Sequence, residues 1–457
     1  MGRNCAVILA AGEGTRMKSS KPKVLAEVLF VPMLDWVIRA VESAWIEDIC
    51  VVTGYRSEAV CEHLGGRYET VLQTQRLGTG HAVAQAKAFI EAHSGGNVLV
   101  LNGDAPLIDK DTITGALEFH TSRSDSATVV SAEIENPTGY GRMVRGADGL
   151  LERIVEQRDA SEEEKRIREV NSGVYWFECD ALLGALDDIA SMGREKKEIY
   201  LTDAIEILLN QCKQADVYIA ENSDVILGAN DRFQLMELNE IARRRILKSH
   251  MINGVSIPCT DGVIIGPEVT IGADTEILPG TIITGKTAIG KGCSVGPQSR
   301  IDSCTVGDEC VLDAVRCENS RIGSSVKLGP FTHLRPGTVL EDGVHAGNFV
   351  EIKNSTVGSD TKISHLTYVG DSDVGNGVNI GCGCATANYD GTKKFRTTVG
   401  DKAFLGCHTC LVAPVKVGNH AYTAAGSVVT EDVPDGTMAI ARSRQTIKRK
   451  VRKYNED

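Results

Sequence analysis

The pattern of hydrophobic positions changes once along the chain, close to residue 252. Up to about residue 229, short runs of β-branched and aliphatic residues alternate with helical stretches, which is typical of an α/β domain with a mainly parallel sheet. We therefore expect a Rossmann-like α/β domain over residues 1–230. Its expected strands cover residues 6–9, 49–52, 97–101, 127–130 and 174–177.

One helix is expected to follow this domain. Between Asp231 and Met251 the apolar residues recur at roughly helical spacing, and Asn230 or Asp231 can cap the start of the helix. We assign residues 231–252 to a helical linker.

Beyond the linker, aliphatic residues recur every six positions. Neither the strand period of two nor the helical period of 3.6 gives this spacing, whereas a three-sided prism with six residues on each face does. One coil then takes eighteen residues, and the pattern predicts a parallel β-helix over residues 253–457. The repeat occupies Ile265, Ile271, Ile277, Ile283, Ile289, Val295 and Ile301, then Ile322, Leu328, Leu334, Leu340, Ala346 and Ile352, then Val399, Leu405, Leu411, Val417, Thr423 and Val429.

The composition fits a folded cytoplasmic protein of at least two domains. The 457 residues exceed one ordinary core, and 42% hydrophobic with 24% charged residues is ordinary for a globular protein. The chain lacks a run of eighteen apolar residues, and its start leads directly into a strand without a signal-peptide pattern. The net charge of −12 argues against nucleic acid as a partner.

The 14 cysteines are too sparse for a disulfide scaffold, and a reducing compartment would keep them as thiols. Four of them have a spacing that can supply zinc ligands, but they also occupy repeat positions that need small side chains. Packing is the preferred interpretation, with zinc as the alternative. The four are Cys382, Cys384, Cys407 and Cys410.

A glycine-containing loop follows the first expected strand, as Leu9-Ala10-Ala11-Gly12-Glu13-Gly14-Thr15-Arg16. Glycines let the backbone approach a phosphate chain, and Arg16 and Lys23 supply positive charge. Residues 73–82 and 102–107 follow other strands, so the three segments fit one ligand crevice. Asp104 is suited to hold Mg²⁺ against a triphosphate, and its alternative role is to cap a turn.

The repeats place candidate chemistry on the β-helix as well. Arg335 and Lys353 are eighteen residues apart and each follows an inward residue, so they should stack on adjacent coils. Two cations so close together favour a phosphate between them, and solvated surface cations are the alternative. His365, two places beyond inward Ile363, should face outward. Residues 387–395 interrupt the repeat and are expected to form a functional loop.

Four further segments complete a resemblance to a known family: residues 139–142 (GYGR), 154–156 (IVE), 170–173 (VNSG) and 200–203 (YLTD). With the motifs above, they resemble the GlmU family of N-acetylglucosamine-1-phosphate uridylyltransferases and glucosamine-1-phosphate N-acetyltransferases, in order over nearly the whole chain. The resemblance implies a left-handed β-helix and a homotrimer. It implies that glucosamine 1-phosphate and acetyl-CoA give N-acetylglucosamine 1-phosphate, which with UTP gives UDP-N-acetylglucosamine for cell-wall synthesis.

For the first half, the resemblance implies a nucleotide and sugar site with Arg16 and Lys23 neutralising the phosphates. Mg²⁺ would be held by Asp104 with Asn230. The nucleotide and sugar would contact Leu9, Ala10, Ala11, Gly12, Lys23, Gln73, Gly78, Thr79, Gly141, Glu156, Asn171 and Asn230.

For the second half, the resemblance makes His365 the general base, and Glu351 is a weaker candidate to orient its imidazole. Acetyl-CoA would contact Cys382, Cys407, Ala425 and Arg442, although the family typically has alanine and serine at the two cysteine positions. Glucosamine 1-phosphate would be held by Arg335, Lys353, Tyr368, Asn379, Asn388 and Tyr389.

Direct acetyl transfer is preferred over an acetylated Cys407, since His408 should diverge from Cys407 in a strand. The basic tail from Arg442 to Lys453 either meets the CoA phosphates or forms a solvated helix. Two other functions stay open: a nucleotidylyltransferase of one activity with a regulatory or structural β-helix, and a non-catalytic β-helical scaffold. The presence of Asp104 and Lys23 speaks against the scaffold.

Overall fold

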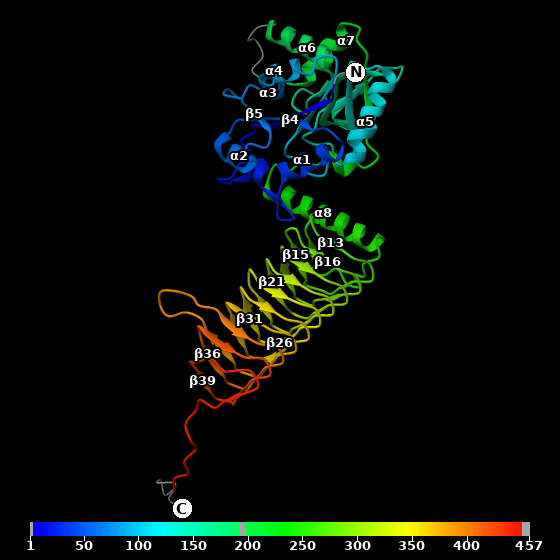
Figure 1. Cartoon of the computed structure of the whole chain (residues 1–457). Coiled ribbons are helices and arrows are strands. Elements are labelled where there is room, and N and C mark those ends of the chain that lie inside the picture. The colour runs from blue at the N-terminus through cyan, green and yellow to red at the C-terminus, as the bar shows by residue number, and fades with distance from the viewer. Residues whose placement is uncertain (1–2, 192–197, 450–457) are drawn as a thin grey trace, which may run out of the picture. The chain divides into compact units, whose positions relative to one another are not determined.

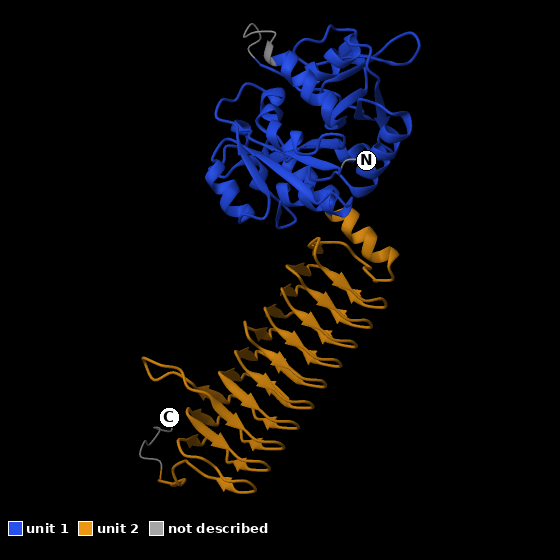
Figure 2. Cartoon of the chain, turned by 45° about the horizontal axis from the view of Figure 1, so that its top comes forward, with its two compact units in different colours: residues 1–242 blue, residues 243–457 orange. Residues whose placement is uncertain are grey.

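The computed structural model describes residues 3–191 and 198–449, and the chain divides into two compact units, residues 1–242 and 243–457 (Figure 2). The division falls within α8 (Arg232–Ile252). Asp231 caps this helix, because its Oδ1 accepts hydrogen bonds from the backbone N–H groups of Phe233 and Gln234, both at 2.9 Å. Asn230, the other cap candidate, is left available for the cavity described below.

The first unit is built on a mixed, mainly parallel sheet in the order β11-β7-β10-β6-β1-β4-β5. β1 pairs in parallel with both β4 and β6, whereas β10 runs antiparallel to its two neighbours. The α/β prediction is confirmed. The strands are β1 (Cys5–Ala10), β4 (Asp48–Thr53), β5 (Glu69–Leu72), β6 (Asn97–Asn102), β7 (Ala127–Glu133), β10 (Glu169–Glu178) and β11 (Ala215–Ile219), with β8 (Arg142–Arg145) and β9 (Leu151–Val155) as a hairpin beside β10.

Helices cover both faces of this sheet (Figure 1). Successive side chains of β1 enter opposite cores: Val7 packs into the cluster that contains Leu182 of α6, and Ile8 into the cluster that contains Val37 of α1. The helices are α1 (Met33–Ser43), α2 (Ser57–Leu64), α3 (Thr79–Gln85), α4 (Lys87–Glu91), α5 (Lys110–Arg123), α6 (Cys179–Ser191) and α7 (Thr202–Asn210). In the part of the chain that the structure describes, no helix is both long and apolar enough to cross a bilayer.

The second unit is a left-handed parallel β-helix of hexapeptide repeats, whose coils stack along one axis (Figure 1). Its three faces are parallel sheets that run from β12 (Ile264–Ile265) to β39 (Val428–Val429), from β13 (Thr270–Ile271) to β37 (Val415–Val417), and from β14 (Glu276–Ile277) to β40 (Met438–Ala439). The aliphatic residue of each repeat points inward and forms one continuous core.

The coil length varies, which corrects the expectation of eighteen residues throughout. Leu334 pairs with Ile352, 18 residues further along the chain, whereas Ile301 pairs with Cys317, only 16 residues away. The stretch that breaks the sequence period therefore still continues the prism, because Val306 and Cys317 point inward on faces with one residue fewer. A period of six cannot reveal such five-residue faces.

Candidate active sites

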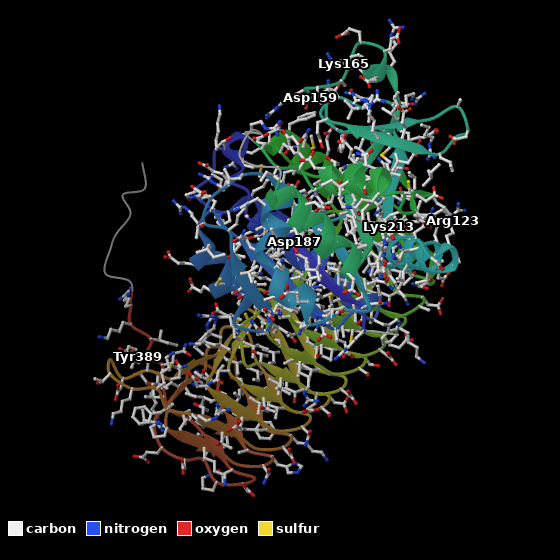
Figure 3. All side chains as sticks on the ribbon, turned by 90° about the horizontal axis from the view of Figure 1, so that it is seen from above. Arg123, Asp159, Lys165, Asp187, Lys213 and Tyr389 are labelled. Carbon is white, nitrogen blue, oxygen red and sulfur yellow. The ribbon has the colours of Figure 1, made fainter. Side chains whose placement is uncertain are left out.

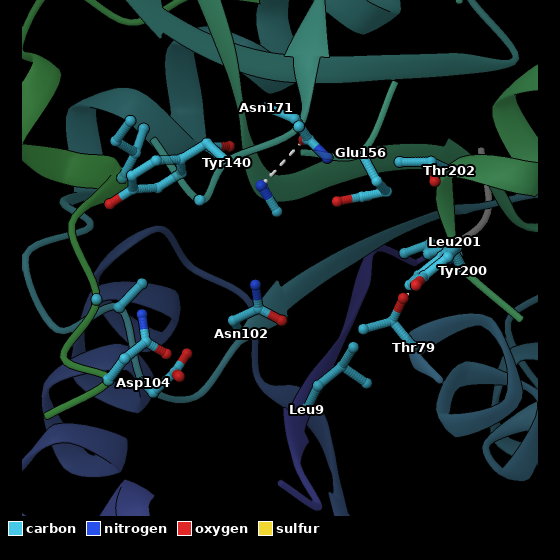
Figure 4. A pocket seen from close by; sticks show the side chains of 18 of the residues that line it. Leu9, Thr79, Asn102, Asp104, Tyr140, Glu156, Asn171, Tyr200, Leu201 and Thr202 are labelled. Atoms are coloured by element: carbon cyan, nitrogen blue, oxygen red, sulfur yellow. Dashed lines mark hydrogen bonds between the residues drawn. The ribbon is translucent and has the colours of Figure 1, made fainter. Parts of the chain in front are cut away.

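The first unit holds a cavity of about 370 Å³ beside a second of about 400 Å³. Leu9, Asn102 and Asp104 line both, and they come from the carboxyl ends of the parallel neighbours β1 and β6 (Figure 4). A crevice at this edge of an α/β sheet is the usual place for a nucleotide. The two cavities form one site, divided at these side chains.

The glycine loop forms one wall of the second cavity. Gly12 faces open space there, since a methyl group at its Cα would meet no atom within 4 Å. Gly14 has a φ of +63° and lies so close to Lys23 that a Cβ would be 2.6 Å from the Lys23 Cβ. The loop is therefore shaped to leave room for a ligand and to let the Lys23 side chain pass beneath it.

A second loop, which carries Gly78 and Thr79, also lines the second cavity. Gly78 has a φ of +109°, and its Cα lies against the carbonyl of Ile199. The buried Gln73 donates from Nε2 to the Gly78 carbonyl at 3.0 Å, and the Thr79 hydroxyl accepts from the backbone N–H of Leu201 at 2.9 Å. This loop is held in place before any ligand binds.

Three side chains meet where the two cavities join. The Lys23 ammonium forms an ion pair with Asp104 and donates a hydrogen bond to Asn230 Oδ1 at 2.9 Å. A carboxylate and an amide oxygen are donors that Mg²⁺ accepts, and here both already face a positive charge. These residues therefore fit a magnesium site completed by phosphate oxygens.

The first cavity continues towards β8, β9 and β10. Gly141, Glu156 and Asn171 line it. Glu156 and Asn171 lie across the cavity from Asn102 and Asp104 (Figure 4). The pKa of Glu156 is raised above its usual value by burial and by the nearby carboxylates of Asp159 and Asp203. The polar side chains of Glu156 and Asn171 are suited to bind the hydroxyl and amide groups of a sugar.

The orientation of Asn171 depends on a tyrosine that no sequence motif indicated. The Asn171 Nδ2 donates to the Tyr175 hydroxyl at 2.6 Å, and its Oδ1 accepts from the backbone N–H of Gly173 at 3.0 Å. Tyr175 also lines the cavity. A tyrosine in a buried strand reads as core from sequence alone, so its polar contact was not predictable.

The structure brings together almost all the side chains proposed for this half. Ala10 is the exception, because it lies on the opposite face of β1 and packs in the hydrophobic core. The residues that line the two cavities are Leu9, Ala11, Gly12, Arg16, Lys23, Gln73, Gly78, Thr79, Asp104, Gly141, Glu156, Asn171 and Asn230.

In the second unit, a group of cations gathers on one face of the prism. Arg335 and Lys353 occupy equivalent positions of neighbouring coils, next to the pairs formed by β24 (His333–Leu334) and β27 (Glu351–Lys353). Lys394, from the loop that interrupts the repeat, reaches the same place. The pKa of Lys353 is lowered chiefly by Lys394 beside it, and then by burial and by Arg335. Glu351 pairs with Arg335 and Asp371 lies near Lys353, so two carboxylates face three cations, and the remaining positive charge favours binding of phosphate.

Glu351 takes part in the cation group. Its carboxylate accepts a hydrogen bond from Arg335 Nη1 at 3.0 Å, so it neutralises part of the cation group. That Glu351 also orients His365 stays a prediction.

On the next coil, the position paired with Lys353 is Gly370, whose missing side chain makes room for the side chains of Tyr368 and Asn388. A Cβ on Gly370 would lie 2.4 Å from the Tyr368 hydroxyl and 2.8 Å from the Asn388 amide nitrogen. The amide nitrogens of Asn354 and Asn388 both donate to Asp371, at 2.5 Å each. Tyr368 and Asn388 are thus held next to the cations.

The loop that interrupts the repeat, residues 387–395, carries exposed side chains. Tyr389 is 59% exposed, lies on the loop that projects from the second unit (Figure 3), and donates from its hydroxyl to the Gly391 carbonyl at 2.5 Å.

His365 and Asn379 lie on a different face of the prism from Arg335 and Lys353. His365 is exposed, as expected, at the end of β29 (Lys362–His365), and Asn379 begins β32 (Asn379–Ile380). Tyr368 follows His365 by three residues, so the two lie on either side of one corner, at most about 11 Å apart between Cα atoms.

The residues proposed for acetyl-CoA form a ladder along one corner. Because Ile380 pairs with Leu405 and Leu405 pairs with Thr423, the positions two residues later stack on successive coils. These are Cys382, Cys407 and Ala425, and the Arg442 side chain lies next to Gly426.

Two expectations at this corner need correction. His408 has a φ of +56° and lies in the corner, not in a strand, with its ring over Gly383. Residues 442–449 are exposed and not helical, and the rest of the basic tail lies outside the described residues. Among residues 3–191 and 198–449, no group of three His, Cys, Asp or Glu side chains is arranged to hold a metal ion, and this includes the four cysteines considered for zinc.

Comparisons with known proteins agree with this geometry. Residues 5–235 match the nucleotidyl transferase family. The bifunctional protein GlmU of Acetivibrio thermocellus is 49% identical over 97% of this chain and 96% of its own length. The GlmU proteins of Caldanaerobacter subterraneus and of a Geobacillus species are 48% and 45% identical, over 97% and 98% of this chain and 96% and 97% of their own lengths.

The first unit and its cavity thus define a nucleotidyl transferase, joined here to a left-handed β-helix. The chain belongs to the GlmU family of bifunctional uridylyltransferases and acetyltransferases. Family membership confirms both transferase activities, their place in UDP-N-acetylglucosamine biosynthesis, and nucleotide and acetyl-CoA as substrates. It excludes the two other functions that the sequence left open.

Proposed function

We propose that residues 1–230 transfer a uridylyl group from UTP to N-acetylglucosamine 1-phosphate, and that residues 253–457 form this acceptor by acetylating glucosamine 1-phosphate. Residues 231–252 connect the two. The contact of Lys23 with Asp104 and Asn230 at the join of the two cavities is the observation that carries the first assignment.

In the uridylyl reaction, a sugar-phosphate oxygen attacks the α-phosphorus of UTP and pyrophosphate leaves. The uracil and ribose lie between the glycine loop and the Gly78 loop, and the sugar lies against Glu156 and Asn171. Arg16 and Lys23 neutralise the phosphates as charge moves to the leaving group. Positioning and charge supply the rate, so a protein nucleophile is unnecessary.

Asp104 and Asn230 would hold Mg²⁺. The ion would supply charge neutralisation of the phosphate oxygens. The donor set fits this role, since a single carboxylate with an amide oxygen leaves several positions for phosphate oxygens and water.

In the acetyl reaction, His365 takes a proton from the sugar amine, which attacks the thioester carbon of acetyl-CoA and expels CoA. Arg335, Lys353 and Lys394 bind the phosphate. Tyr368, Asn379 and Asn388 hold the sugar, with Tyr389 on the same loop. Acetyl-CoA lies along Cys382, Cys407, Ala425 and Arg442; the two cysteine side chains are small, so they leave room for it.

The enzyme is a cytoplasmic homotrimer in this proposal, with acetyl-transfer sites between subunits. Support comes from the location of His365 and Asn379 on a face separate from the cations. A stacked pair of exposed rings, Phe331 and Phe349, 60% and 55% exposed with centroids 5.2 Å apart, offers an apolar contact for another subunit. Analytical ultracentrifugation should give three times the mass of the chain.

The complete proposal is tested by omission of substrates. Purified protein with glucosamine 1-phosphate, acetyl-CoA, UTP and Mg²⁺ should release free thiol, pyrophosphate and UDP-N-acetylglucosamine. Without acetyl-CoA the nucleotide product should disappear, and added N-acetylglucosamine 1-phosphate should restore it. Formation of that product from glucosamine 1-phosphate without acetyl-CoA would contradict the proposal.

A further inference from the structure

The Lys23 ammonium occupies the space between two oxygen donors of the expected metal site. It forms an ion pair with Asp104 and a 2.9 Å hydrogen bond with Asn230 Oδ1. Its side chain is only 11% exposed, so the contact is sheltered from solvent. In this arrangement both donors already have a cationic partner.

We propose that Lys23 is an internal counter-cation of the metal site, which keeps divalent cations out until a nucleotide arrives. This inference rests on the proposed function of Asp104 and Asn230. The phosphates of the nucleotide draw the ammonium away from these donors, and the divalent ion then takes its place. Lys23 therefore acts on the order of binding as well as on the phosphates.

Electrostatics support this exchange. An ammonium and a divalent cation repel each other strongly at contact distance, so both cannot share one carboxylate in a sheltered site. Asp104 is also a weak site by itself, because among the described residues no cluster of three acidic, histidine or cysteine side chains surrounds it. A metal ion that had to displace Lys23 without phosphate oxygens would gain too few ligands.

The structure also gives Lys23 a place to go. Lys23 lines the cavity of about 400 Å³ together with Gly12 and Glu13 of the glycine loop. Its stem already fills the space left by the missing side chain of Gly14, so the ammonium is the part that moves into the cavity. Lysine is a compact charge on a flexible four-carbon chain, so it can turn towards bound phosphates without movement of the backbone.

The nucleotide should therefore raise the affinity for the metal by more than coordination of the metal by its phosphates would give alone. The nucleotide supplies ligands to the metal and also removes a competing cation. By thermodynamic linkage the metal raises nucleotide affinity by the same factor. Removal of the ammonium should abolish the second part of this coupling only.

Mn²⁺ provides the test, because its free concentration can be followed by electron paramagnetic resonance without turnover. In nucleotide-free full-length protein, Lys23→Met should bind Mn²⁺ at least about tenfold more tightly than the unchanged protein, since a contact charge repulsion is removed. Lys21→Met is the matched control. Lys21 lies two residues away, pairs with Glu27 at 3.7 Å and is 70% exposed, so its loss should leave Mn²⁺ affinity unchanged.

Equal or weaker Mn²⁺ binding by Lys23→Met would overturn the inference, as would an equal gain in Lys21→Met. Lys23→Gln serves as a second variant if Lys23→Met does not fold. Adding Asp104→Asn to either Lys23 variant should remove the gain, which locates the bound ion.

A parallel titration with a non-hydrolysable UTP analogue separates this inference from the proposed function. If Asp104→Asn leaves Mn²⁺ affinity unchanged in the presence of the analogue, the metal site itself is wrongly assigned and both fail. If that variant weakens binding but Lys23→Met gains nothing without nucleotide, the inference alone fails.

Discussion

Arg335 and Lys353 lie at equivalent positions on adjacent coils, because Leu334 pairs with Ile352 across the sheet. Two cations in this position repel each other, and Lys394 adds a third from the inserted loop. An anion relieves this repulsion. The arrangement is thus organised for a phosphate before the substrate arrives.

Lys394→Ala should raise the KM for glucosamine 1-phosphate about tenfold, because a charge-assisted hydrogen bond contributes about 1.5 kcal/mol or more. The kcat should change little, since Lys394 contacts the phosphate and takes no part in the proton transfer at the amine. Lys393→Ala is the matched control, with an exposed lysine in the same loop. An equal rise in KM in both variants would show a general loop effect and contradict a specific contact.

Gly12→Ala should affect the binding of UTP without affecting the stability of the fold. No atom lies within 4 Å of the added methyl group, so the free energy of unfolding should change by less than about 0.5 kcal/mol. The methyl group enters the nucleotide cavity, and the KM for UTP should rise about tenfold or more. Steady-state kinetics and thermal unfolding measure the two effects. An unchanged KM would place the nucleotide elsewhere.

Gly78→Ala should act through the fold instead. Its φ of +109° is unfavourable for alanine, and the Cβ would lie 2.2 Å from the Ile199 carbonyl oxygen. We expect a loss of about 2 kcal/mol or more in the free energy of unfolding, measured with denaturant. A stable Gly78→Ala variant would contradict the close approach of these two segments.

His120 should make the first unit sensitive to acid. It is 2% exposed in α5, with Nδ1 2.9 Å from the Thr128 hydroxyl, and burial lowers its pKa to about 4. The unfolded chain therefore binds a proton at higher pH than the folded one. Stability is fully present above the unfolded pKa, near 6.5, and is lost as the pH falls towards 4.

Between pH 7 and pH 5 this residue should remove about 2 kcal/mol from the free energy of unfolding. Calorimetry of the unchanged protein and of His120→Gln measures the difference, and the comparison separates His120 from neighbouring Asp125, whose pKa is raised by burial. If the two proteins lose equal stability over this range, His120 is not the cause.

The fold was predictable where the spacing of hydrophobic residues along the chain directly reflects which side chains point inward. The hexads from Ile265 to Ile301 define inward positions by spacing alone, and the strand at residues 6–9 with its glycine loop indicates the crevice. The five-residue faces around Cys317 were not predictable, since shortening a face by one residue removes the period that identifies it.

The site was predictable as sets of residues on one strand or coil, but not as contacts between distant segments. Arg335 and Lys353 follow from the repeat. The contacts of Lys23 with Asn230 and of Asn171 with Tyr175 depend on packing of the whole unit. Lys394 reaches the cations because the loop folds back, which the sequence indicates only as an interruption.

The central claim is that one chain carries two separate chemical sites, and paired variants test it most directly. Asp104→Ala should lower pyrophosphate release at least about 100-fold while thiol release from acetyl-CoA stays within twofold, since Asp104 lies in the first unit. His365→Ala should lower thiol release by at least about 100-fold and spare uridylyl transfer to added N-acetylglucosamine 1-phosphate. A folded variant of either kind that loses both activities would contradict the account.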